Sequence, residues 1–182
     1  MNEGALATRG RPAAWALPAA PASASVSCDT RAVIRTYTDD DLGEVLDAWY
    51  LASLEAHSFL SEDFFKAERE LLSDRWLPSS DTWVFEIGGH VVGFVSMVGN
   101  EVGGIFVAPN RQNRGVGRAL LDHVAATRLY LEVEVFNANT IGRRFYGAYG
   151  FRVVGEGLDD TTGLPILRLR IDLLSRRCRL ST

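Results

Sequence analysis

The sequence has few of the residues that build disulfide frameworks and metal sites. It contains two cysteines and three histidines in 182 residues. Cys28 and Cys178 lie near opposite ends of the chain, and two isolated thiols form neither a disulfide framework nor a metal site. We therefore expect no bound metal and a reduced, cytoplasmic setting. No apolar run approaches the ~18 residues that suggest a membrane span, so we expect no membrane association.

A surplus of positive charge is also missing. Lys and Arg number 19 against 23 Asp and Glu, which gives a net charge of −4. Proteins dedicated to nucleic-acid binding normally carry a basic surplus, so we expect no nucleic-acid partner. Lys66 is the only lysine, and every other basic residue counted here is arginine. This preference indicates a bias in genome composition. No arginine is therefore notable merely for being arginine.

The chain is long enough for one domain with a sizeable core. Residues 1–30 differ from the rest, because Ala, Pro and Ser dominate there and Pro12, Pro18 and Pro21 interrupt any apolar segment. We expect a disordered leader or a start-site extension at 1–30, one folded domain at 31–172 and a basic tail at 173–182.

The hydrophobic periodicity changes repeatedly along the domain, which predicts the element order β-α-α-β-β-β-α-β-α-β-β. This order favours an α/β fold with one central mixed sheet and helices on both faces. The expected strands are 32–37, 82–87, 91–98, 100–109, 129–136, 151–156 and 165–171. Four helices are expected: one after Thr38, one from Ser61 that Pro78 and the two serines after it end, one over 114–126, and one that ends at Gly150. The side chains expected on their inner faces are Leu42, Val45, Leu46, Trp49 and Ser53; Phe64, Phe65, Leu71, Leu72 and Trp76; Val116, Ala119, Leu120, His123 and Val124; and Ile141, Phe145, Ala148 and Tyr149.

The segment RQNRGVGRAL (111–120) places two glycines among three arginines at the start of a predicted helix. A helix N-terminus exposes unpaired N–H groups, and glycine lets a phosphate approach the backbone closely. The dinucleotide-binding pattern needs a third glycine where Leu120 stands, and the nucleotide-binding P-loop needs Gly-Lys-Ser/Thr. Neither is present, so the segment predicts an anion site of another kind, or a plain glycine turn.

A longer pattern surrounds this segment. QNRGVG fits Gln/Arg-x-x-Gly-x-Gly/Ala after a strand that ends in IFVAP, and in NANTIGRRFYGAYGF Asn139 precedes Tyr146 by seven residues. Together these features resemble the GCN5-related N-acetyltransferase (GNAT) superfamily over about residues 31–171. The segments EAHSFLSEDF, LPSSDTWVFE and GIFVAPNRQNRGVGRALLDH are most similar to its small bacterial YjaB-type branch. The resemblance implies a mostly antiparallel sheet and direct acetyl transfer from acetyl-CoA, as co-substrate, to a primary amine.

The resemblance also implies where acetyl-CoA binds. Its pyrophosphate would lie on the backbone amides of the glycine loop, and its pantetheine arm would extend the preceding strand. Asn139 would contact the cofactor or cap the helix that follows it. The implied cofactor-binding residues are Ile105, Phe106, Val107, Gln112, Asn113, Arg114, Gly115, Val116, Gly117, Arg118 and Asn139.

The catalytic roles follow from the same resemblance. Tyr146 is placed as the general acid that protonates the leaving thiolate, with a packed aromatic as the alternative. Glu101 begins the strand that leads to the glycine loop, and the resemblance makes its carboxylate a candidate catalytic group. The alternative is a solvated charge at the end of the strand. His57 and Phe59 lie in the loop that covers the acceptor, where His57 could serve as base, ligand or structural histidine.

The acceptor is expected to be a small-molecule or peptide amine, and the chain is expected to be a monomer or a homodimer. Two other functions stay open at this point. One is a non-catalytic sensor or assembly module that binds acyl-CoA, and the other is a generic phosphate-ligand domain.

Overall fold

The computed structural model describes residues 31–174. The expected leader at 1–30, and the expected tail from residue 175 onward, lie outside these residues, and so does the pair Cys28 and Cys178.

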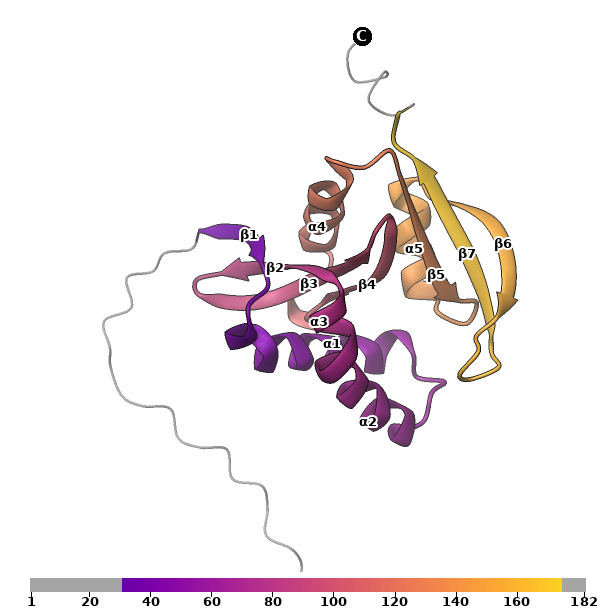
Figure 1. The fold of residues 1–182 in the computed structure, drawn as a ribbon, viewed down its shortest axis with the longest axis horizontal. Helices are drawn as coiled ribbons and strands as arrows, with labels where there is room; N and C mark the ends of the chain where they lie inside the picture. Colours follow the sequence, from indigo (N-terminus) through magenta and orange to yellow (C-terminus); the bar gives the residue numbers. More distant parts are fainter. Residues whose placement is uncertain (1–30, 175–182) are drawn as a thin grey trace, which may run out of the picture.

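Seven strands form one sheet in the order β1-β2-β3-β4-β5-β7-β6 (Figure 1). Adjacent strands are antiparallel except for β4 and β5, which run parallel. The element order and the mostly antiparallel mixed sheet are therefore confirmed. The strands are β1 Ala32–Thr36, β2 Asp81–Ile87, β3 His90–Val98, β4 Glu101–Val107, β5 Tyr130–Phe136, β6 Arg152–Leu158 and β7 Pro165–Asp172. The α-helices are α1 Leu42–Ala56, α2 Glu62–Leu71, α3 Leu77–Ser79, α4 Val116–Ala125 and α5 Thr140–Tyr149. The described residues also include three short helical turns: η1 Asp39–Asp41, η2 Leu72–Trp76 and η3 Pro109–Arg111.

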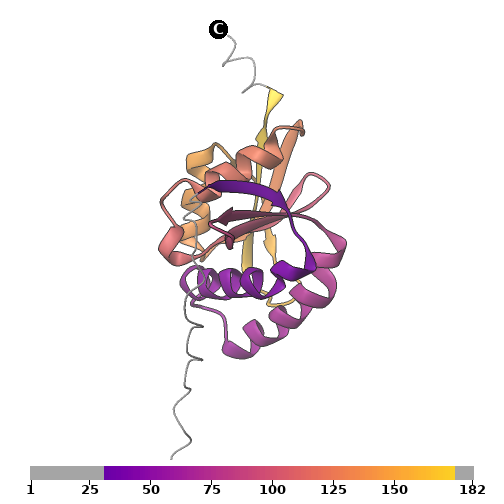
Figure 2. The same cartoon turned by 90° about the vertical axis from the view of Figure 1, so that its left-hand side faces the viewer.

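Helices cover both faces of the sheet, with α1 to α3 on one face and α4 and α5 on the other (Figures 1 and 2). Successive residues of a strand point to opposite faces. Phe94 accordingly packs in the core with Val45 and Trp49 of α1, while its neighbour Val95 packs with Leu120 of α4 on the other face. Strand β3 is buried almost throughout, as expected for a strand covered on both sides.

The sheet divides between β4 and β5. These strands are joined through a single paired position, Glu101 with Glu132, and beyond it they diverge. Strand β5 instead follows β7 over its whole length, from Tyr130 to Phe136 (Figure 1). The divergence leaves one edge of β4 without a strand partner over 105–107, while its other edge pairs with β3.

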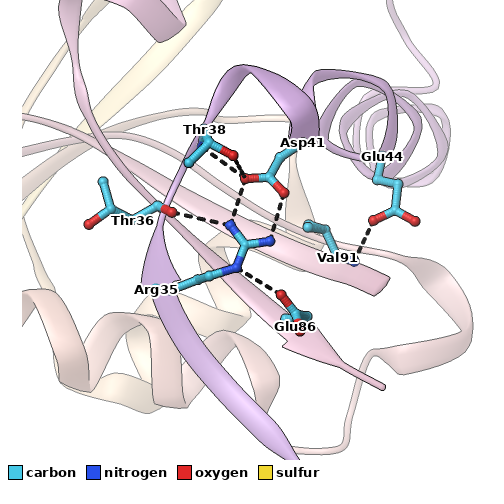
Figure 3. Close-up of polar contacts among 7 residues, drawn as sticks. All are labelled: Arg35, Thr36, Thr38, Asp41, Glu44, Glu86 and Val91. Carbon is cyan, nitrogen blue, oxygen red and sulfur yellow. Dashed lines mark hydrogen bonds and ion pairs between the residues drawn. The ribbon is translucent and has the colours of Figure 1, made fainter. Parts of the chain in front are cut away.

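A polar network ties β1 to the start of the first helix and to the central strands (Figure 3). Both terminal nitrogens of Arg35 donate to Asp41 at 2.7 Å, and its Nε donates to Glu86 at 2.7 Å. The backbone N–H of Thr38 also donates to Asp41, at 2.8 Å. One turn later, Glu44 accepts from the backbone N–H of Val91 at 2.6 Å. The Asp41 carboxylate accepts hydrogen bonds from two residues, Arg35 of β1 and Thr38 of the loop that follows, which fixes where α1 begins.

Helix boundaries mostly match the sequence analysis. Ser61 caps α2 by accepting from Phe64 N–H at 3.2 Å, and Gly150 ends α5 with a φ of 118°. Thr38 is the N-cap of the short turn η1, which leads directly into α1, and its backbone N–H and hydroxyl both bond to the Asp41 carboxylate. The second helix continues through η2 and α3 and ends at Ser79 with Ser80 as C-cap, so Pro78 and the two serines after it mark its end as expected.

Several side chains expected on buried helix faces are exposed. Trp76 is displaced because it is the last residue of the π-helical turn η2, which widens the helix and shifts the periodicity. His123 lies on the surface against Trp83, with ring centroids 5.6 Å apart, and Leu121 is buried in its place. The other expected core side chains that are exposed are Leu71, Ile141 and Ala148.

Candidate active site

A cavity of about 780 Å³ lies where β4 and β5 diverge. Residues 103–107 of β4 form one wall and residues 133–136 of β5 form the other. Helices α1 and α2 close it on one side, and the glycine loop and α5 close it on another. Its volume is in the usual range for small-molecule and cofactor sites.

The free edge of β4 is the first functional feature of this cavity. Ile105, Phe106 and Val107 line it, and their pairing partners on β3 lie at the opposite edge. Backbone groups that have lost a neighbouring strand can pair with an extended ligand. Gly103 and Gly104 continue the same wall.

The glycine loop at 112–118 is the second feature. Gly115 has a φ of 86°, a left-handed conformation that costs glycine nothing, and it is the N-cap of α4. The first hydrogen bond inside α4 runs from Ala119 N–H to Gly115 C=O, so the N–H groups of residues 116–118 have no helical acceptor. Gln112 Nε2 donates to the carbonyl of Val107 at 3.1 Å and holds the loop against the end of β4. The loop therefore directs unpaired donors and the positive helix end toward the cavity.

Gly117 has a second reason to be glycine. A Cβ at this position would lie 3.2 Å from the ring of Phe145, which also lines the cavity. Val116 between the two glycines points into the core and is buried, so it anchors the loop. Arg118 remains exposed beside the cavity and lies 3.8 Å from Asp122.

Tyr146 lines the cavity from α5. Its ring packs against Phe145 and Phe151, with centroids 5.2 and 5.3 Å apart. Burial raises the pKa of its phenol well above the ordinary value, so the hydroxyl keeps its proton at every physiological pH. Within residues 31–174 the hydroxyl forms no hydrogen bond. A protonated phenol without a partner can donate to a ligand in the cavity.

Asn139 caps α5, as one of the two interpretations of the sequence predicts. Its Oδ1 accepts from the backbone N–H of Gly142 at 2.7 Å. Its Nδ2 lies 3.0 Å from Nε2 of His57, which comes from the end of α1. Both residues line the cavity, so this contact joins the two sides of the site. Burial lowers the pKa of His57, which favours the neutral ring.

The structure brings most of the predicted site residues to one cavity. Four are not among its lining residues: Glu101, Phe59, Arg114 and Val116. Glu101 is exposed at the paired end of β4, away from the diverging end. Phe59 packs on two lining residues, His57 and Phe136, with ring centroids 5.9 and 5.6 Å apart. It therefore supports the cavity wall without lining it.

Two cavity carboxylates are missed by the sequence analysis. Glu134 lies on β5, where the alternation of buried valines with glutamates could have marked it, and it pairs with Arg168 at 2.6 Å. Glu68 lies on α2 with its side chain half-buried, and burial, with Asp159 as a weaker influence, raises its pKa. Nothing in the local sequence distinguishes Glu68 from the other acidic residues of that helix.

Among residues 31–174, no group of three or more His, Cys, Asp or Glu side chains could hold a metal ion. No helix in that part of the chain is long and apolar enough to cross a membrane.

The chain is similar to known acetyltransferases. Residues 78–153 match the family model described as Acetyltransferase (GNAT) domain. The peptidyl-lysine N-acetyltransferase YiaC of Escherichia coli (strain K12) is 33% identical over 134 residues, 73% of this chain and 92% of that protein. The peptidyl-lysine N-acetyltransferase YjaB of Salmonella typhimurium (strain LT2) is 33% identical over 125 residues, 68% of this chain and 86% of that protein. The solution structure of apo YjaB from Escherichia coli superposes with a TM-score of 0.70 at 27% identity, covering 77% of this chain and 97% of that one.

Proposed function

Because the chain belongs to the GNAT family and is an acetyl-CoA-dependent N-acetyltransferase, we propose that its acceptor is the side-chain amine of lysine in a protein or peptide. Two relatives named for this activity are each 33% identical to the chain, and together they motivate the choice of acceptor. The observation that carries the proposal is the cavity at the β4–β5 divergence, which combines an anion-binding loop, a free strand edge and ionisable side chains.

We assign the cofactor to one side of this cavity. The pyrophosphate of acetyl-CoA binds the unpaired amides at the start of α4, and the pantetheine arm pairs with the free edge of β4 at Ile105–Val107. The thioester then lies between the two strands, near Tyr146 of α5. Gln112 to Arg118 hold the phosphate end, with Arg114 and Val116 contributing through their backbone amides.

The chemistry is direct transfer between two bound substrates. The neutral lysine amine attacks the thioester carbonyl, the C–S bond breaks, and the acetyl group forms an amide with the amine. Tyr146 donates a hydrogen bond or its proton to the departing thiolate. The proton that the amine loses passes to a carboxylate of the cavity. The product pair is N-acetyl-lysine and CoA.

A proton acceptor matters for this substrate. A lysine amine has a pKa near 10.4, so presenting it neutral at pH 7 costs roughly 4–5 kcal/mol. Glu68 and Glu134 are the carboxylates that line the cavity, and Glu101 is not among the lining residues. Glu68 is half-buried with a raised pKa, which makes it the more basic choice, whereas Glu134 pairs with Arg168 at 2.6 Å. We therefore place Glu68 first as proton acceptor and Glu134 second.

The deciding experiment supplies acetyl-CoA and N-terminally blocked peptides that contain one lysine. We expect released thiol and a peptide heavier by one acetyl group, measured by a thiol reagent and by mass spectrometry. The matched control replaces the lysine with arginine, which keeps the charge and removes the nucleophile. Acetyl-CoA binding without thiol release on any lysine peptide or protein extract would instead favour the non-catalytic sensor.

A further inference from the structure

We propose that Asn139 is a positioning residue that holds His57 as a neutral imidazole with its proton on Nδ1. In that form His57 acts at the acceptor side of the cavity as a hydrogen-bond donor and not as the proton acceptor. The role in transfer rests on the proposed function, whereas the protonation state of the ring can be measured without any substrate.

The hydrogen-bond geometry determines which nitrogen carries the proton. The backbone N–H of Gly142 can only donate, so the Asn139 atom that it contacts at 2.7 Å must be the oxygen. The amide nitrogen of Asn139 then faces His57, and this Nδ2 can likewise only donate. Nε2 of His57, 3.0 Å away, is therefore the acceptor, and the proton of a neutral ring must be on Nδ1.

The same arrangement opposes protonation of the ring. A proton on Nε2 would point at the N–H of Asn139, and rotating the amide would turn its NH₂ group toward the N–H of Gly142. The ring is also held by edge contacts with Phe59 and Phe136, at centroid distances of 5.9 and 5.8 Å. Turning the ring to present Nε2 to a substrate would remove the hydrogen bond from Asn139.

Gly142 is the residue that makes room for this arrangement. A Cβ at position 142 would lie 2.8 Å from Nδ2 of Asn139 and 3.2 Å from its Cγ. An alanine here would favour the helix by about 0.5–1 kcal/mol, but it would displace the Asn139 side chain. Glycine is a weaker helix former than alanine, and its presence at 142 is explained by the space that the Asn139 side chain needs.

Two donors on one wall of the cavity remain open to a ligand. Nδ1–H of His57 has no partner within residues 31–174. Ser53, one turn earlier on α1, lines the cavity, and its Oγ is buried with no hydrogen-bond partner in that part of the chain. Side chains four residues apart on a helix lie next to each other. We infer that this pair binds a carbonyl oxygen of the bound substrates.

Nitrogen–proton correlation NMR on the full-length protein labelled with ¹⁵N tests the tautomer. The chain has three histidines, and a His57→Gln variant assigns the signals of His57. We expect an unprotonated Nε2 and a protonated Nδ1 at pH 7.5. A proton on Nε2 in the wild type would overturn the proposal, whatever the enzyme acetylates.

Two variants test the role of Asn139. Asn139→Asp keeps an oxygen for Gly142 N–H but replaces the donor that faces His57 with an acceptor, so Nε2 should become protonated. Gly142→Ala should release Nε2 by displacing Asn139. Gly147→Ala is the matched control on the same helix, because a Cβ there would meet nothing within 4 Å, and it should leave the tautomer and the turnover unchanged.

Turnover with a lysine peptide provides the second measurement. Asn139→Asp should lower kcat about tenfold, which corresponds to the loss of one hydrogen bond of ordinary strength, while the Kd for acetyl-CoA stays within about twofold. A tautomer that survives both variants would overturn the positioning role. A loss of acetyl-CoA affinity with kcat unchanged would also overturn it, and would make Asn139 a cofactor ligand.

Discussion

Tyr146 shows how one side chain can combine packing with chemistry. Its ring is part of the larger core, between Phe145 and Phe151, and its hydroxyl stays protonated because burial raises its pKa. The sequence pattern offers two interpretations, a core aromatic or a general acid. The structure is compatible with both at once, since a buried ring can support a hydroxyl that reaches the cavity.

We expect Tyr146→Phe to lower turnover by about 10²–10⁴-fold, the usual contribution of general acid catalysis. The ring is kept, so the affinity for acetyl-CoA and the melting temperature should stay near the wild-type values. Tyr149→Phe is the control, because Tyr149 is buried on the same helix but donates to Asp122 at 2.7 Å. Turnover of Tyr146→Phe within twofold of wild type would leave Tyr146 as a core aromatic.

Asp41 carries a prediction about stability and pH. Hydrogen bonds from Arg35 lower its pKa from 3.8 to about 2. Because the folded-state value is the lower one, the contribution is complete above about pH 4 and is lost as the pH falls toward 2. A shift of this size corresponds to about 2 kcal/mol.

Asp41→Asn should therefore lower the free energy of unfolding by about 2 kcal/mol at pH 7, and much less near pH 2. Urea denaturation at both pH values measures the difference. Asp39→Asn, an exposed neighbour on the same turn, should change stability by less than about 0.5 kcal/mol. An equal loss at both pH values would mean that ionisation of Asp41 is not the source of its contribution.

At the scale of elements, the glycine loop and the free edge of β4 form one unit. Gln112 connects them by donating to the carbonyl of Val107 at 3.1 Å. The loop thus begins where the strand ends, and the two parts of a long ligand can be bound by consecutive segments of backbone. Only backbone groups are needed, and the glycines at 115 and 117 leave the backbone of the loop open to a ligand.

Gly117→Glu should weaken acetyl-CoA binding by about 100-fold or more, since a like charge placed beside a phosphate costs several kcal/mol. Isothermal titration calorimetry measures the effect. A side chain at 117 also approaches Phe145 at 3.2 Å, so the melting temperature must be compared in parallel. Gly43→Glu adds the same charge on α1, where a Cβ would meet nothing within 4 Å, and should bind like the wild type. Unchanged affinity in Gly117→Glu would remove the loop from the cofactor site.

At the scale of the whole molecule, the sheet consists of two halves that are joined through one paired position between β4 and β5. A ligand that pairs with β4 and contacts α5 would connect these halves. Binding to the folded state alone stabilises a protein by about 2.7 kcal/mol at 100 times the Kd.

We expect acetyl-CoA at that concentration to raise the melting temperature by about 5–10 °C, the shift that 2.7 kcal/mol gives in a chain of this size. ATP and NAD at equal concentration are the controls, because they supply phosphates without a pantetheine arm. Equal stabilisation by all three ligands would support a generic phosphate site in place of a specific acetyl-CoA site.

The sequence alone determined the order of elements and the two caps at Ser61 and Gly150. These depend on local interactions, so periodicity and single residues are sufficient to predict them. It also placed the glycine loop at the start of α4, because helix N-termini bind anions through their own backbone.

Only the tertiary structure decided which side chains meet. His57 and Asn139 are 82 positions apart, and Glu68 reaches the cavity only because α2 folds back over it. Glu101 was the carboxylate chosen from the sequence, and it lies at the paired end of β4 because the strands diverge at their other end. The same divergence makes Ile141 a lining residue and not a core residue. Packing on both faces of the sheet determines where the two strands separate. That packing involves residues far apart in the sequence, so no local pattern predicts it.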